Sequence, residues 1–151
     1  MEVADKIYKS EVDLMEFPQN LAVMLAQNAE KLSNMPVYQE IKNGEYEPLT
    51  WSQFITDISL IQDYLVSAGF KSGDHLAILS ENRQEMLELE LAVMAMGGRV
   101  VPIFSGYDAE KADTLVNFCD AEYVAVADDI QLNKISVPDK FKNIIHFEKV
   151  S

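Results

Sequence analysis

The sequence has a single cysteine, few basic side chains and no long apolar run. Cys119 cannot form a disulfide within the chain, nor can it build a metal site of several cysteine thiolates. Lysine and arginine number 12 against 25 aspartate and glutamate residues, which gives a formal net charge of −13. Binding to nucleic acid requires basic surface that releases counterions, so we expect no nucleic-acid partner.

The apolar stretches all fall short of the ~20 residues that a membrane-spanning helix needs. Residues 1–17 mix acids and bases and lack the apolar centre of a signal peptide. The composition, 48% apolar and 25% charged over 151 residues, is that of one soluble globular domain. We expect a cytoplasmic protein without a transmembrane segment, and a peripheral contact with a membrane is compatible with this expectation.

The first third of the chain predicts a helix followed by a small hairpin. Apolar residues recur every three or four positions over 21–32, the spacing of an amphipathic helix. Two short strands, 36–41 and 46–49, flank Asn43 and Gly44, a pair typical of tight hairpin turns.

The next helix has the clearest start and end signals in the sequence. Thr50 and Gln53 have the spacing of a capping box, in which each side chain accepts a hydrogen bond from the backbone of the other residue. Gly69 follows the expected last residue, Ala68, where a left-handed conformation commonly ends a helix. The predicted buried face is formed by Phe54, Ile58, Ile61 and Leu65.

From residue 74 onward, short apolar runs alternate with helical segments. The predicted strands are 75–79, 100–104, 122–127 and 143–147. Asn82 with Glu85, and Asp108, are predicted to cap the helices between them, whereas 128–142 is expected to be a loop with a single turn. This β-α-β series predicts a three-layer α/β fold, a mostly parallel sheet flanked by helices with the β-hairpin beside it.

Three motifs in residues 49–128 resemble one enzyme family. They are LTWSQF at 49–54, GDHLAILSENRQEM beginning at Gly73, and GGRVVPIFSGYDAEKA beginning at Gly97. In this order and spacing they resemble the AMP-forming acyl-CoA synthetases of the adenylate-forming superfamily, most of all the long-chain fatty-acid–CoA ligases. The resemblance implies that residues 1–151 are the N-terminal part of the large N-terminal domain of a longer enzyme.

The resemblance also implies an activity and its cofactors for the parent enzyme. Members of the family use ATP and Mg²⁺ to convert a fatty acid to an acyl-adenylate, and then transfer the acyl group to coenzyme A. Their phosphate loop ending in Pro-Lys, their ribose-binding aspartate and the lysine of their mobile C-terminal domain have no match here. We therefore assign no catalytic residue and expect a scaffold that is inactive alone and whose partner is the remainder of the same polypeptide. The alternative is a stand-alone, non-catalytic α/β domain that binds a ligand or a partner.

One ligand contact follows from the resemblance. Phe104, Ser105 and Gly106 match a turn that contacts the adenosine part of coenzyme A in acetyl-CoA synthetases, with Ser105 in place of a glycine. The alternative is structural: Gly106 permits a tight turn from strand to helix, and Phe104 packs in the core.

Other polar residues at predicted strand ends are weaker candidates. Arg83 could hold a phosphate at a helix start, but a helix entry capped by Asn82 is the simpler interpretation. Asp128 and Asp129 follow a strand without the further acids that a Mg²⁺ site needs.

The remaining candidates are acids and histidines, for which we expect structural roles. The acids Glu81, Glu85, Glu88 and Glu90 are predicted to form a solvated helix face, so no metal is assigned. His75 and His146 lie in predicted strands without a nucleophile nearby in sequence, and structural roles are expected for both. The last strand candidate is predicted to leave an exposed sheet edge through which copies of the chain could associate.

Overall fold

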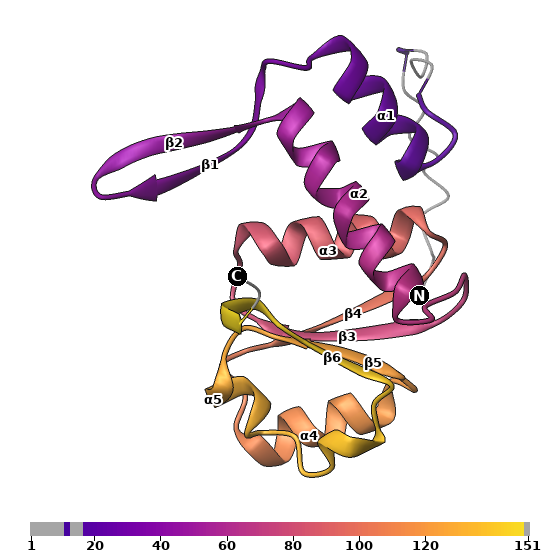
Figure 1. Cartoon of the computed structure of the whole chain (residues 1–151), viewed down its shortest axis with the longest axis vertical. Coiled ribbons are helices and arrows are strands. Elements are labelled where there is room, and N and C mark those ends of the chain that lie inside the picture. The colour runs from indigo at the N-terminus through magenta and orange to yellow at the C-terminus, as the bar shows by residue number, and fades with distance from the viewer. Residues whose placement is uncertain (1–10, 13–16, 150–151) are drawn as a thin grey trace, which may run out of the picture.

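The computed structural model describes residues 11–12 and 17–149. Helix α1 (Leu21–Lys31) starts where Asn20 Oδ1 accepts a 2.9 Å hydrogen bond from the Val23 amide. Strands β1 (Pro36–Lys42) and β2 (Glu45–Thr50) form the predicted antiparallel hairpin, which extends away from the rest of the molecule (Figure 1). Asn43 and Gly44 both have positive φ, as the turn signal predicted.

Helix α2 (Trp51–Ser67) begins and ends as its sequence signals predict. Thr50 Oγ1 accepts from the Gln53 amide, and Gln53 Oε1 accepts from the Thr50 amide, so the capping box is complete. At the other end Gly69 has a φ of 86°, and the amides of Gly69 and Phe70 bind the carbonyls of Val66 and Leu65. This pattern is a Schellman motif.

The central element is a four-stranded sheet whose strands are all parallel, in the order β4-β3-β5-β6. Helices α2 and α3 cover one face and α4 lies on the other, so the molecule has three layers (Figure 1). This confirms the predicted fold class. The elements are β3 (His75–Ser80), α3 (Gln84–Ala95), β4 (Arg99–Phe104), α4 (Ala109–Phe118), β5 (Tyr123–Val126) and β6 (Asn143–His146).

The sheet is buried on both faces along its two inner strands. On β3, Leu76 and Ile78 pack in the cluster with α2 and α3, whereas Ala77 and Leu79 pack in the cluster with α4. The loops after β3 and β4 leave neighbouring strands toward opposite faces of the sheet. In open α/β sheets such a reversal opens a crevice beyond the carboxyl ends of the strands, where ligands commonly bind.

Two predictions about local structure were wrong. Asn82 does not cap α3; the N-cap is Arg83, whose guanidinium has no hydrogen-bond acceptor and so cannot cap the helix amides, and it binds Glu85 instead. Residues 128–142 contain α5 (Asp129–Leu132) and a 3₁₀ helix at Pro138–Lys140 rather than a loop with one turn. Helices of three and four residues are too short to produce a periodic pattern.

Candidate functional site

The turn after β4 has a defined backbone geometry. The Tyr107 amide donates a 3.2 Å hydrogen bond to the Phe104 carbonyl, which closes the turn. Asp108 Oδ1 then accepts a 2.8 Å bond from the Lys111 amide and starts α4, as predicted. The residues of the sequence-predicted ligand contact, Phe104, Ser105 and Gly106, therefore lie together at the carboxyl end of an edge strand.

The Phe104 side chain lies on the surface, so the alternative that it packs in the core was wrong. Its exposed fraction is 67%, because β4 is an edge strand and the alternate residue, Ile103, takes the buried position. The Phe104 ring meets Tyr107 edge to face, with ring centroids 5.4 Å apart. Lys111 Nζ lies 4.3 Å from the centroid of the Tyr107 ring. An exposed aromatic ring with a neighbouring cation can stack a flat ring and attract a phosphate.

Gly106 leaves room for the Phe104 ring in its present position. A Cβ atom at residue 106 would lie 2.5 Å from Phe104 Cε1 and 2.7 Å from Cζ. The φ of Gly106 is not in the left-handed region, so the reason for glycine is space rather than backbone conformation. The aromatic ring thus lies directly over the turn.

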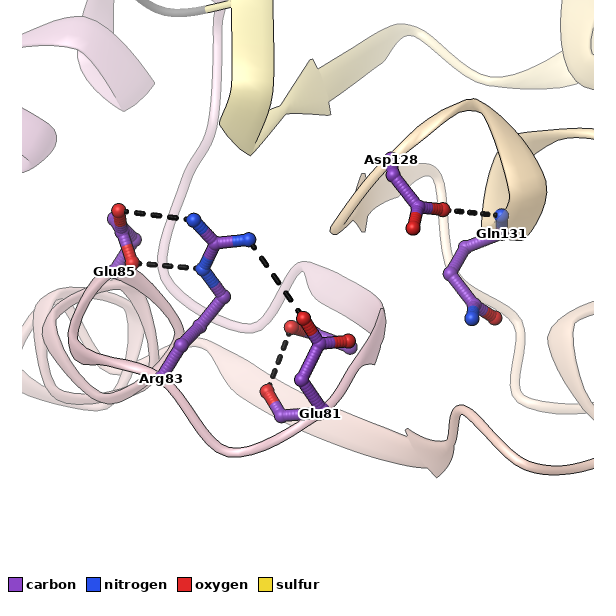
Figure 2. A network of polar contacts seen from close by, with 6 residues as sticks. Glu81, Arg83, Glu85, Asp128 and Gln131 are labelled. Atoms are coloured by element: carbon purple, nitrogen blue, oxygen red, sulfur yellow. Dashed lines mark hydrogen bonds and ion pairs between the residues drawn. The ribbon is translucent and has the colours of Figure 1, made fainter.

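The loop after β3 places Arg83 among carboxylates, as Figure 2 shows. Its Nε and Nη2 donate to the two carboxylate oxygens of Glu85 at 2.8 and 3.1 Å, and Nη1 lies 3.8 Å from Glu81 Oε1. The hydrogen bond to Glu85 is the main cause that raises the pKa of Arg83. The guanidinium is therefore engaged by two acids and is not available as a phosphate clamp in this arrangement.

The acids after β5 have structural partners. Asp128 Oδ1 accepts from the Gln131 amide at 2.8 Å and caps α5 (Figure 2). Asp129 Oδ1 lies 3.0 Å from Nε2 of the buried His146. Sequence reasoning missed this pair, because the two residues are far apart in the chain and meet only once β5 and β6 are adjacent. Among the described residues, no group of three or more histidine, cysteine, aspartate and glutamate side chains could hold a metal.

His75 and Glu88 have buried or half-buried surroundings. His75 Nδ1 is 2.9 Å from the Cys119 carbonyl, and its Nε2 is 2.7 Å from Arg99 Nη1.

Glu88 is only 5% exposed, so the prediction that Glu81, Glu85, Glu88 and Glu90 form a solvated face was wrong. It precedes Leu89 by one residue and Ala92 by four, and this phase could have placed it on the buried face of α3.

Glu88 lies in a groove of about 690 Å³ lined by α2, α3 and β6. The pKa of its carboxyl is raised to about 7, chiefly by burial and also by the negative charges of Asp57 and Glu85, while the hydrogen bond from Gln84 lowers it. No helix among the described residues is long and apolar enough to cross a membrane.

Comparison with known proteins identifies the family. The sequence profile of the AMP-binding enzyme family matches residues 25–150. This chain belongs to that family. A similar curated protein is the long-chain-fatty-acid–CoA ligase FadD15 of Mycobacterium bovis, 28% identical over 61% of this chain and 15% of its own length. Another is the long-chain-fatty-acid–CoA ligase ACSBG2 of Mus musculus, 24% identical over 85% of this chain and 20% of its own length. The chain therefore spans about a fifth or less of these relatives.

Solved structures share the fold of this AMP-binding family member. The N-terminal domain of FACL13 from Mycobacterium tuberculosis aligns with a TM-score of 0.78 at 20% identity, over 88% of this chain and 35% of that one. A putative long-chain-fatty-acid CoA ligase from Rhodopseudomonas palustris aligns with a TM-score of 0.74 at 22% identity, over 87% of this chain and 33% of that one. The α/β fold of this chain is therefore shared with these two solved proteins.

Proposed function

We propose that this chain is the N-terminal part of the large N-terminal domain of a long-chain fatty-acid–CoA ligase. The observation that carries the proposal is the family match over residues 25–150, and FadD15 and ACSBG2 have that activity in their names. The carboxylate of the fatty acid attacks the α-phosphate of ATP and releases pyrophosphate. The thiol of coenzyme A then attacks the acyl-adenylate carbonyl and releases AMP.

In this proposal the chain supplies scaffold rather than catalytic groups. Its sequence contains no Ser/Thr/Gly-rich loop ending in Pro-Lys whose backbone amides could surround a triphosphate. ATP and Mg²⁺ are therefore assigned to residues outside this chain, and the chain alone is expected to be inactive. Its partner is the remainder of the ligase polypeptide.

The chain does supply one ligand contact in this proposal. Phe104, Ser105 and Gly106 contact the adenosine part of coenzyme A. The exposed ring of Phe104 and the cation of Lys111 beside Tyr107 support this assignment, because a nucleotide combines a flat base with phosphates.

The coding sequence downstream of the Ser151 codon tests the proposal first. The expected result is an open frame that continues into a Ser/Thr/Gly-rich loop ending in Pro-Lys, an aromatic-Thr-Glu segment and a C-terminal lysine. A stop codon at that position would remove the enzyme assignment and leave a stand-alone binding domain.

A further inference from the structure

Lys134 lies in the connection from β5 to β6 and contacts the candidate site after β4. It lies between α5 and the 3₁₀ helix, and its half-buried side chain extends to the turn after β4. Its Nζ donates hydrogen bonds to the carbonyls of Ser105 at 2.6 Å and of Tyr107 at 2.8 Å. Hydrogen bonds from an ammonium are about twice as strong as those between neutral groups, so two of them hold the turn firmly.

These two bonds fix the direction of two peptide groups. In a planar trans peptide the carbonyl of one residue and the N–H of the next point in opposite directions. Because the carbonyls of Ser105 and Tyr107 both point at Lys134, the N–H groups of Gly106 and Asp108 point away from it. Within the part of the chain that the structure describes, neither of these N–H groups donates a hydrogen bond.

We propose that Lys134 is a positioning residue for the site formed by Phe104, Ser105 and Gly106. It orients the turn so that the N–H groups of Gly106 and Asp108 face outward as donors to a ligand that stacks on Phe104. Its ammonium lies on the side of the turn opposite these N–H groups, and Lys111 supplies a second cation beside Tyr107 that could meet a phosphate. This inference rests on the proposed coenzyme A contact and names a residue outside the motif that suggested it.

A purely structural role for Lys134 makes a different prediction. If the lysine only held the α5 region against the sheet, its loss would weaken every activity of the enzyme equally. If it orients the turn, its loss affects the step that uses coenzyme A and leaves adenylation intact.

The test compares three variants of the full-length ligase that contains this chain: Lys134→Met, Lys134→Arg and Phe104→Ala. Methionine keeps the length of the apolar stem and removes the donors, whereas arginine keeps the donors. Pyrophosphate exchange into ATP measures adenylation, and thioester formation gives the KM for coenzyme A. Thermal unfolding of each variant shows whether it is folded at the assay temperature.

We expect Lys134→Met to raise the KM for coenzyme A about tenfold, the effect of losing one or two charged hydrogen bonds, with pyrophosphate exchange changed by less than about twofold. Lys134→Arg should recover most of the loss, and Phe104→Ala should also raise this KM. An unchanged KM in Lys134→Met beside a raised KM in Phe104→Ala would overturn the positioning role and leave the coenzyme A contact standing. An unchanged KM in Phe104→Ala would overturn the contact and the positioning role together, and equal loss of both activities in folded Lys134→Met would assign Lys134 a structural role.

Discussion

Gln84 Nε2 donates a 2.8 Å hydrogen bond to Glu88 Oε1, one turn further along α3. This bond is the main stabilising contact of a carboxylate that is otherwise in an unfavourable place, because Glu88 is 5% exposed and lies near Asp57 and Glu85. Burial outweighs the bond, and the pKa of Glu88 is raised from 4.5 to about 7. Glu88 therefore makes folding stability depend on pH close to neutrality.

The change Glu88→Gln should stabilise the chain above pH 7. Between pH 4.5 and about 7 the folded state keeps the Glu88 proton that the unfolded state has lost, so stability falls as pH rises through this window. A glutamine keeps the hydrogen bond to Gln84 and cannot ionise. We expect a gain on the order of 1–3 kcal/mol at pH 8 and none at pH 4, measured by urea unfolding at a series of pH values.

The matched control is Glu30→Gln on α1, which removes a carboxylate from an exposed position. It should change the free energy of unfolding by no more than about 0.5 kcal/mol. If Glu88→Gln left the decline between pH 5 and 7 as steep as in the parent chain, the assignment of this decline to Glu88 would be wrong.

Replacing Thr50 by alanine should destabilise the start of α2. The change removes the hydroxyl that accepts from the Gln53 amide and leaves that amide without its cap. The expected loss is about 1 kcal/mol in the free energy of unfolding, with Thr50→Ser close to the parent. Ser52→Ala, at an exposed position two residues later, is the control and should be nearly neutral. Equal effects at both positions would argue against the capping box as the cause.

Two glycines should respond differently to alanine because the side chains around them differ in freedom. At Gly98 a Cβ would lie 2.6 Å from Phe70 Cζ and 2.8 Å from Val93 Cγ1, and both of these side chains are buried. At Gly106 it would meet only the exposed ring of Phe104, which can rotate away. Thermal or urea unfolding should show a loss of about 1–3 kcal/mol for Gly98→Ala and less than about 1 kcal/mol for Gly106→Ala. The opposite order would contradict the packing described here.

Strand β6 forms one edge of the sheet among the described residues, next to the groove lined by α2 and α3. An edge with unpaired backbone groups can pair with another copy of the chain. We predict that the 151-residue chain associates with itself as its concentration rises. Elution as a monomer over a hundredfold range of concentration would count against this prediction.

Where local signals are strong, the sequence predicts the fold well. The capping box at Thr50, the glycine at 69 and the aspartate at 108 each act over three or four residues, and the structure has all three as predicted. The strands of the parallel sheet were predicted within one residue at each end, because their short apolar runs stand out from the helices between them.

Apart from the start of α3 and the short helices in 128–142, the predictions that were wrong concern relationships across the fold. The acids in and before α3 were grouped together, but Glu88 is buried beneath α2 and β6 whereas Glu81, which precedes the helix, is exposed. Phe104 is apolar and ends an apolar run, but its exposure depends on β4 being an edge strand. The contact of Lys134 with the turn after β4 joins residues that lie 27 and 29 positions apart, and no local pattern records it.

The most direct test of the proposed function is an assay of the full-length protein that contains this chain, with the 151-residue chain assayed in parallel. Pyrophosphate exchange into ATP that depends on a long-chain fatty acid, and acyl-CoA formation after coenzyme A is added, would be measured for both. We predict both activities in the full-length protein and neither in the chain alone. A full-length protein that is folded and shows neither activity with any fatty acid, or a 151-residue chain that catalyses exchange alone, would contradict the account.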